Sequence, residues 1–361
     1  MKTSPCRSLL KVTPLAAVLA ALAPASALAD FSGSDSLASK SAKWDQPVAN
    51  NGGGKTIFQN SRIEYTVKSP TTEDLSVFRW TPNQGSYTKN WYIQVDTHLD
   101  AVALSEGSYA NMQLVVLKTG DFNKGYSFSL NRFRNTQMPS SYVTGFEGGI
   151  FESNNHAYTK NSTLNATLRV HFNSSAKTLT GSWSAGKGWK FFAPVSIAGW
   201  NMTSSDTFTA ALAGDSGNDG VGANVGPVIA SGKGWFTNFK AGPATPDLAV
   251  EQPTGTHLSD GRGKTNFGTI LVGGSGVVKS FTVSNAGTAR LVGKSITKTG
   301  ANAADFTIVP PSKTNYAPGD SSTFKVTFKP KAKGMRTAVI HISTNDPTGA
   351  PFDINLTGSG K

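Results

Sequence analysis

The chain has 361 residues, which at about 150 residues per domain predicts two domains, or one large β domain with an appendage. Charged residues make up only 16 %, and the chain contains 38 glycines and 18 prolines. Its polarity comes from Ser, Thr and Asn, which are poor helix formers, so long helices, coiled coils and helical repeats are excluded. The formal net charge is +12, and a hydrophobic content of 38 % excludes wholesale disorder.

The first 29 residues have the pattern of a cleaved secretion signal. Basic residues precede an apolar run over residues 15–23, and Ala27-Leu28-Ala29 supplies a small-residue cleavage site before Asp30. A run of this length is shorter than the roughly 20 apolar residues that span a bilayer. We therefore expect a protein that begins at Asp30 and works outside the cell, free or at the cell surface, with no membrane span.

The cysteine content and the distribution of charge further restrict the kinds of site and partner that the chain can have. Cys6 is the only cysteine and lies within the expected signal, so disulfides, thiolate metal sites and cysteine nucleophiles are excluded from the mature chain. Residues 244–361 are the more basic part, and five basic side chains crowd together there: Lys325, Lys329, Lys331, Lys333 and Arg336. Such a run suits anionic partners, but lysines also keep strand edges from pairing. We favour a solvated strand edge and expect no nucleic-acid partner.

Alternation of apolar and polar residues dominates residues 30–241 and predicts a large antiparallel sandwich. In the segment Trp91–Leu99, the apolar residues and Thr97 share one face of a strand, and the other polar residues share the opposite face. Further strands are expected at Met112–Leu117, Tyr126–Phe133, Leu164–Phe172, Phe208–Leu212 and Gly234–Phe239.

A proline-containing linker is expected at Gly242–Pro246, followed by a second β domain over 247–361. Short strands are expected there at Lys279–Ser284, Phe324–Phe328, Ala338–Ser343 and Phe352–Thr357, with turn signals every 10 to 15 residues. This spacing is typical of an immunoglobulin-like sandwich.

The second domain resembles the choice-of-anchor D domain, which is related to the ASH and major-sperm-protein immunoglobulin-like modules. The matching segments are Asp247–Pro253, Asn266–Gly268, Phe281–Thr288, Ala303–Phe306, Ala317–Gly319, Val326–Pro330 and Ser343–Pro347. The resemblance implies an extracellular bacterial module that often precedes a C-terminal sorting signal. Because this sequence ends at Gly358-Ser359-Gly360-Lys361 without a hydrophobic tail, we expect release rather than anchoring.

The first domain resembles the concanavalin A-like lectin and glucanase jelly rolls. The similar segments are Asp30–Ser32, Arg62–Val67, Arg79–Trp80, Trp91–Leu99 and Gly234–Phe239. That fold hosts lectins, glucanases, lyases and adhesion modules, so the resemblance does not settle the function.

The polar face of the Trp91–Leu99 strand supplies the candidate ligand-binding residues. Sugar recognition needs an aromatic surface and planar polar groups, which this face combines, and Trp80, Arg79 and Arg169 are candidate neighbours. The candidate ligand-binding residues are Tyr92, Gln94, Asp96, His98 and Trp80. The tryptophans in general, Trp235 among them, are expected in the core, and His171 and His341 on exposed strand faces.

Two further groups of residues bear on other chemistries, glycoside hydrolysis and calcium binding. Asp96, His98 and Asp100 alternate as the acidic residues of retaining glucanases do, but the Glu-x-Asp-x-Glu pattern of that family is absent. Asp215 and Asp219 lie in the glycine-rich segment 214–220 and are the candidate calcium ligands. The EF-hand pattern fails, and we interpret this segment as a strand connection.

The sequence thus predicts a secreted bacterial protein without catalytic activity, whose first domain binds an extracellular or surface carbohydrate. Two alternatives stay open. One is a polysaccharide hydrolase or lyase that uses the Asp96/His98 face, and the other is a structural or adhesive matrix protein. No cofactor is expected, apart from the calcium alternative.

Overall fold

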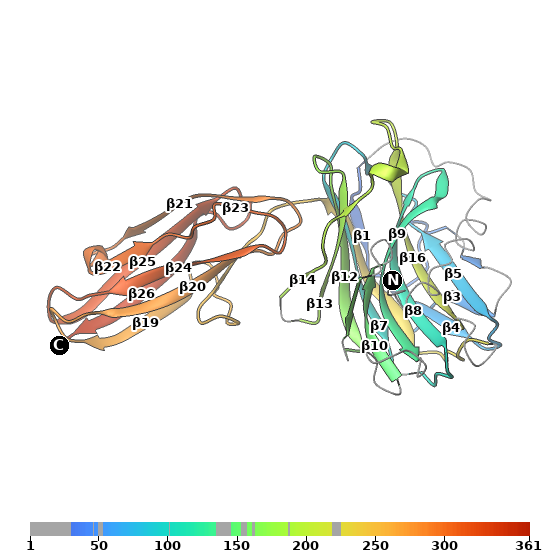
Figure 1. Cartoon of the computed structure of the whole chain (residues 1–361), viewed down its shortest axis with the longest axis horizontal. Coiled ribbons are helices and arrows are strands. Elements are labelled where there is room, and N and C mark those ends of the chain that lie inside the picture. The colour runs from blue at the N-terminus through green and yellow to red at the C-terminus, as the bar shows by residue number, and fades with distance from the viewer. Residues whose placement is uncertain are drawn as a thin grey trace, which may run out of the picture. The chain divides into compact units, whose positions relative to one another are not determined.

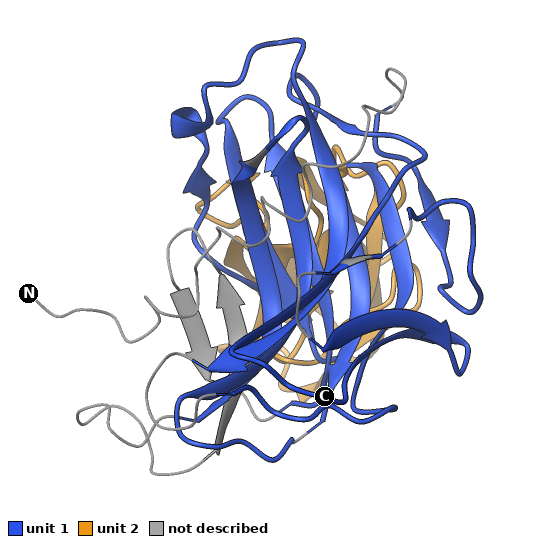
Figure 2. Cartoon of the chain, turned by 90° about the vertical axis from the view of Figure 1, so that its right-hand side faces the viewer, with its two compact units in different colours: residues 1–243 blue, residues 244–361 orange. Residues whose placement is uncertain are grey.

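The computed structural model describes residues 30–361 apart from 46, 50–52, 101, 135–145, 153–156, 161–162, 187 and 219–224. The expected signal, residues 1–29, lies outside the described residues. The chain divides after Pro243 into two compact units, which Figure 2 colours separately. Both are built from strands, with only two short 3₁₀ helices in the described part of the chain, Ala198–Trp200 and Ala303–Asp305 (Figure 1). The all-β prediction is confirmed, and no helix among the described residues is long and apolar enough to cross a membrane.

The first unit is a sandwich of two antiparallel sheets, which we call sheet I and sheet II. Sheet I has the order β14-β13-β12-β7-β17-β4-β3, with β1 beside β17 and β15 beside β13. Its strands are β1 (Gly33–Asp35), β3 (Gly54–Gln59), β4 (Arg62–Val67), β7 (Trp91–Leu99), β12 (Asn165–Asn173), β13 (Thr178–Ser184), β14 (Lys190–Phe191), β15 (Val195–Ser196) and β17 (Gly234–Pro243). The pairing of β1 with β17 joins the first and last strands of the unit.

Sheet II has the order β11-β10-β9-β8-β16-β5-β2, with β6 beside β16. Its strands are β2 (Val48–Ala49), β5 (Glu73–Arg79), β6 (Gly85–Ser86), β8 (Ser108–Lys118), β9 (Asp121–Arg134), β10 (Phe146–Glu152), β11 (Ala157–Lys160) and β16 (Thr207–Asn218). The strands expected from alternation in the first domain are present, and the expected strand at Trp91–Leu99 has the bounds of β7.

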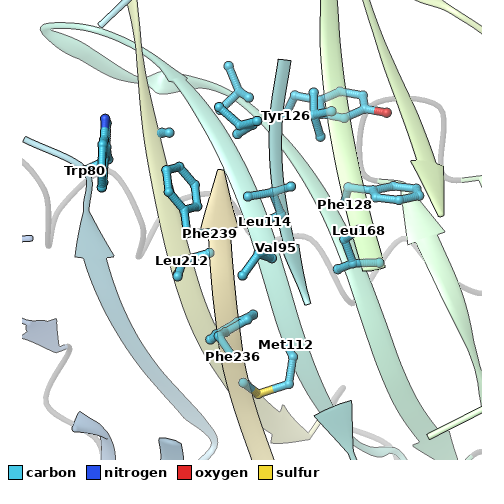
Figure 3. Packing of buried hydrophobic residues seen from close by; sticks show 14 of the residues in the cluster. Trp80, Val95, Met112, Leu114, Tyr126, Phe128, Leu168, Leu212, Phe236 and Phe239 are labelled. Atoms are coloured by element: carbon cyan, nitrogen blue, oxygen red, sulfur yellow. The ribbon is translucent and has the colours of Figure 1, made fainter. Parts of the chain in front are cut away.

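The inward faces of sheets I and II form one apolar core. Val95 of β7, Leu212 of β16 and Phe236 of β17 are fully buried, and Figure 3 shows them among the other core side chains. Trp91 packs against Phe172 with ring centroids 5.4 Å apart. Burial of this much aromatic and aliphatic surface stabilises a chain that has no disulfide in its described part.

Sheet I extends into the first two residues of the segment expected as a linker. Gly242 and Pro243 are the last residues of β17, and they pair with Tyr92 and Trp91 of β7. Proline lacks a backbone N–H but keeps its carbonyl group, so it can be the last paired residue of a strand. The second unit follows from Ala244 onward.

The second unit is an immunoglobulin-like sandwich. One sheet has the order β18-β20-β24-β22 and the other β19-β26-β25-β21-β23. The strands are β18 (Leu248–Glu251), β19 (Gly263–Ile270), β20 (Val277–Asn285), β21 (Leu291–Thr299), β22 (Phe306–Val309), β23 (Asn315–Tyr316), β24 (Ser321–Phe328), β25 (Gly334–Thr344) and β26 (Phe352–Gly360). All pairings are antiparallel except that of β19 with β26. Phe281 and Phe324 stack in its core, with centroids 4.9 Å apart.

Candidate functional site

The strand β7 divides its side chains as the sequence predicts. Ile93 and Val95 are fully buried in the core, whereas Tyr92, Gln94, Asp96 and His98 are half-buried on the outer face of sheet I. A strand alternates its side chains between the two faces of a sheet, so one buried set fixes the opposite orientation of the other. The prediction that Tyr92, Gln94, Asp96 and His98 share the outer face is confirmed.

Asp96 is held by one hydrogen bond on each carboxylate oxygen. Thr167 of β12 donates its hydroxyl to Oδ1 at 2.6 Å, and the Asn238 amide of β17 donates to Oδ2 at 2.9 Å. Asn238 lies in a bulge of β17, where the register against β7 shifts between Thr237 and Lys240 and its own φ is +54°. A bulge re-aims side chains, and here it places the amide over Asp96.

A polar pocket of about 420 Å³ opens beside Asp96. Strands β7, β12 and β17 supply most of its wall, and the end of β13 closes one side. Hydroxyl, amide and carboxylate groups predominate among its side chains, together with one aromatic ring. The lining residues are Asp96, Thr97, Thr163, Asn165, Ala166, Thr167, Ser184, Ala185, Gly186, Trp235 and Thr237.

His98 and Trp235 stand side by side next to this pocket. Their rings stack with centroids 4.8 Å apart and planes 9° apart, and the Arg62 guanidinium lies 4.9 Å from the Trp235 ring. His98 Nδ1 shares a hydrogen bond of 2.7 Å with Asn165 Oδ1, while its Nε2 lies 3.6 Å from Asp100 Oδ1. The Trp235 ring therefore packs against both the His98 ring and the Arg62 guanidinium.

Trp235 was expected in the core, and that prediction is wrong. Its neighbour Phe236 points into the core and is fully buried, so Trp235 points outward and is half-buried. Alternation within the segment Gly234–Phe239 carried this signal, because Thr237 lies on the same face as Trp235. Thr167 and Asn238 were also missed, since their contacts with Asp96 depend on strand register and on the bulge.

His98, Trp235 and Arg62 form a stacked row, and buried Glu64 of β4 binds Arg62 at its end. It pairs with Trp235 in the sheet register and accepts hydrogen bonds from the Arg62 Nε at 2.7 Å, the Ser231 hydroxyl at 2.8 Å and the Gly232 N–H at 2.9 Å. Burial raises the pKa of this carboxyl, but the hydrogen bonds from Asn60, Ser231, Arg62 and Gly232 outweigh it and lower the pKa to about 2.

Tyr92 and Gln94 lie on the same face but do not line the pocket. Arg169 Nε donates to Gln94 Oε1 at 2.9 Å, and its guanidinium lies 5.6 Å from the Tyr92 ring and 3.5 Å from the Trp189 ring. Arg169 thus covers part of the Tyr92 surface that the sequence left for a ligand. Tyr92 and Gln94 thus form a cluster with Arg169 that is separate from the pocket beside Asp96.

Trp80 is not part of this face. Its side chain is buried in the core of the first unit, where its ring lies 5.3 Å from that of Trp44 and 4.8 Å from that of Phe239. Its indole N–H donates to Asn83 Oδ1 at 3.1 Å. Because core packing encloses it, the Trp80 side chain does not reach the outer face of sheet I and cannot bind a ligand there.

Asp215 lies in a strand and not in a connection. It is a buried residue of β16, where Asn111 and Gln113 of β8 donate to its Oδ2 at 3.2 and 3.0 Å. Burial raises its pKa to about 7, and the nearby Glu73 and Asp74 charges raise it too, against the lowering effect of the two amides. Two amide donors leave this oxygen little room for a cation. The other calcium candidate, Asp219, lies outside the described residues, which contain no group of three or more acidic, His or Cys side chains suited to a metal ion.

His171 of β12 was expected on an exposed face, and that prediction is also wrong. The side chain is 3 % exposed, and the ring of Phe191 from β14 lies 6.4 Å from it. Burial, with a smaller effect from the Arg169 charge, lowers its pKa to about 3, so the ring is neutral. His341 does lie half-buried on an outer face, hydrogen-bonded at 2.7 Å through Nδ1 to Asp353.

Comparison with known proteins gives one family match. A family model described as the HYDIN/CFA65/VesB-like, Ig-like domain matches residues 261–359, in agreement with the immunoglobulin-like second unit. The choice-of-anchor D resemblance is not found by this match. A search of curated protein sequences gave no match.

Solved structures similar to the chain include carbohydrate-binding proteins. A lectin II from Ulex europaeus is 11 % identical, with a TM-score of 0.35 over 55 % of this chain and 98 % of its own. A winged bean acidic lectin in complex with methyl-alpha-D-galactose is 11 % identical, with a TM-score of 0.39 over 58 % and 97 %. A CBM2 module of the Lactobacillus casei BL23 phage J-1 evolved Dit is 10 % identical, with a TM-score of 0.35 over 59 % and 94 %. Similarity at these values says nothing about the ligand of this chain.

Proposed function

We propose that the first unit binds a carbohydrate in the pocket beside Asp96 and that the protein is not an enzyme. The observation that carries the proposal is the pocket itself, whose wall combines the Asp96 carboxylate, the Thr167 and Thr237 hydroxyls and the Asn165 amide with the Trp235 ring. Ligand sites are typically concave, with a few fixed polar groups that orient the ligand. This pocket is more polar than most, which suits a ligand covered in hydroxyl groups.

The hydrogen bonds of Asp96 leave it able to bind such a ligand. An ionised carboxylate offers about four acceptor positions, and Thr167 and Asn238 occupy one on each oxygen. The remaining positions can accept hydrogen bonds from ligand hydroxyls, and bonds to a charged group are worth about 1.5 to 3 kcal/mol. Because both side-chain oxygens are already oriented, little conformational entropy is lost when the ligand binds.

The spacing of the carboxylates supports a binding role over hydrolysis. Asp96 and Asp100 are four residues apart along an extended chain, a span of about 13 Å at roughly 3.3 Å per residue. Paired glycosidase carboxylates lie about 5 to 9.5 Å apart. Asp100 is moreover engaged by the Lys233 ammonium at 2.9 Å. Release of reducing ends from any polysaccharide that binds would contradict the non-catalytic proposal.

The carbohydrate proposal is tested by a glycan array on the processed chain, followed by calorimetric titration of the best ligand. Asp96→Asn is expected to weaken binding about tenfold, the loss of one charged hydrogen bond. Thr167→Val, which removes the donor to Asp96, is expected to weaken binding by a smaller factor. Asp121→Asn is the matched control, because Asp121 lies at the start of β9 in sheet II. Unchanged affinity in Asp96→Asn, or an array with no ligand, would leave a structural or matrix role as the better account.

We propose further that the chain is a secreted bacterial protein whose second unit is a choice-of-anchor D module. The basic start, apolar run and cleavage site of residues 1–29 support export, and the segments from Asp247 to Pro347 support the module. N-terminal sequencing of protein from the culture medium is expected to begin at Asp30. Extracellular protein that still begins at Met1, or protein found only inside the cell, would refute export by a cleaved signal.

A further inference from the structure

A mostly apolar cavity, partly open to solvent, is formed by residues of the second unit alone. Its volume is about 180 Å³, and its apolar lining comes from both sheets: Leu248, Val283, Leu291, Ile296, Tyr316 and Ile342. The loop between β22 and β23, with Pro310 and Pro311, forms a further wall. Consecutive prolines have fixed φ angles, so this wall is stiff.

A cavity with such a lining favours an apolar occupant. Apolar cavities stay dry, and an engineered one of about 150 Å³ binds benzene, because water inside lacks hydrogen-bond partners. An empty cavity also forfeits the dispersion contacts of its lining, so an apolar group that fills it restores them. The size suits a body of about six carbon atoms, by the same comparison with benzene.

The charged residues of the cavity wall are both basic. Lys294 and Lys313 line it, and no acidic residue does. Lys313 is already neutralised by Asp320, whose Oδ2 lies 2.6 Å from its Nζ. Lys294 is exposed and forms no ion pair within residues 244–361, all of which are described. An anionic ligand would therefore find its partner in Lys294.

The local backbone places Lys294 at this position. In the pairing of β21 with β25, Gly293 is opposite Thr344 and Ser295 is opposite Ser343, so Lys294 is an extra, bulged residue. A bulge interrupts the alternation of a strand and re-aims a side chain. Lys294 therefore lines the cavity together with Gly293 and Ser295, its neighbours on both sides.

From these observations we propose that the cavity of the second unit binds a small amphipathic anion. The apolar body of the ligand, about six carbons long, lies among Val283, Leu291 and Ile342, and its carboxylate pairs with the Lys294 ammonium. The site is independent of the carbohydrate pocket, since every residue that lines it belongs to the second unit.

The test uses hexanoate, hexan-1-ol and hexylammonium, which share an apolar chain and differ in charge. Methyl NMR on the processed chain is expected to show saturable hexanoate shifts at Val283, Leu291, Ile296 and Ile342, and none at Val95 in the first unit. Hexan-1-ol is expected to bind about fivefold more weakly, the size of one exposed ion pair, and hexylammonium more weakly still.

Lys294→Gln is expected to weaken hexanoate binding to the level of hexan-1-ol and to leave hexan-1-ol itself unchanged. Lys264→Gln, an exposed lysine of β19 outside the cavity, is the matched control and is expected to bind hexanoate normally. Absence of saturable shifts at these methyl groups with millimolar hexanoate would overturn the site. Equal affinity for all three probes, or no effect of Lys294→Gln, would overturn its preference for an anion.

Discussion

Replacing Asp215 with asparagine is expected to stabilise the first unit strongly at pH 7 and to have little effect at pH 4. Burial raises the pKa of Asp215 to about 7 in the folded chain, from 3.8 for an ordinary Asp. The folded state therefore holds this proton more tightly than the unfolded state does. Its contribution to stability is complete below about pH 3.8, falls as the pH rises toward 7, and is lost above that.

The expected gain above pH 7 is on the order of 4 kcal/mol, since each unit of pKa difference corresponds to about 1.4 kcal/mol. Asparagine keeps the carbonyl oxygen that accepts from Asn111 and Gln113, and it removes the charge that the Glu73 and Asp74 carboxylates repel. It thus imitates the protonated aspartic acid at every pH.

Urea unfolding between pH 4 and pH 8 measures the effect, with tryptophan fluorescence as the signal. All seven tryptophans lie between Trp44 and Trp235, so the signal reports on the first unit alone. The stability of wild type relative to that of Asp215→Asn is expected to fall between pH 4 and pH 7, whereas the titration of buried His171 changes both proteins alike. Asp121→Asn, which changes the same charge near the start of β9, is expected to keep the wild-type slope. A wild-type slope in Asp215→Asn would show that Asp215 is ionised and well solvated.

The segment around Asp215 also shows that a glycine-rich composition does not always mark a connection between strands. Gly214 predicts a connection by composition, but it lies within β16 opposite the ring of Tyr65. A Cβ at Gly214 would come within 2.0 Å of the Tyr65 ring, so this glycine serves close packing inside the core. Local composition cannot separate a glycine that turns the chain from one that admits a ring from a distant strand.

The β7 strand shows what alternation does predict. Its bounds, its buried face and its polar face all follow from the order of residues between Trp91 and Leu99, because the side-chain period of a strand is fixed. The neighbours of that face do not follow from it. Thr167 and Asn238 contact Asp96 only because β12 and β17 pair with β7 in one register, and the register depends on the whole sandwich.

The burial of an outer-face residue by a short neighbouring segment is also not predictable from the sequence. His171 alternates correctly with apolar neighbours on β12, so its place on the outer face was predictable. Its burial results from the short strand β14, whose Phe191 lies over that face. A two-residue strand is too short to show periodicity, so the sequence does not predict which part of an outer face it covers.

Replacing Glu64 with glutamine is expected to destabilise the first unit by about 3 kcal/mol at pH 7. Burial raises the pKa of Glu64, but the hydrogen bonds from Asn60, Ser231, Arg62 and Gly232 lower it to about 2, from 4.5 for an ordinary Glu. The folded state binds this proton less tightly than the unfolded state. The contribution of Glu64 is therefore present above about pH 4.5 and is lost as the pH falls toward 2, opposite in sign to that of Asp215.

The difference in stability between wild type and Glu64→Gln is expected to shrink as the pH falls from 4.5 to 2, as measured by the same fluorescence-detected unfolding. Glu251→Gln in the second unit, which changes the same charge, is expected to leave the tryptophan signal unchanged. A difference that stays constant over this range would show that glutamine disturbs packing and that the charge of Glu64 contributes little. Because Glu64 also holds the Arg62 guanidinium over Trp235, Glu64→Gln is expected to weaken carbohydrate binding at pH 7 even in protein that remains folded. Full affinity in that variant would mean that the pocket beside Asp96 does not depend on the stacked row of His98, Trp235 and Arg62.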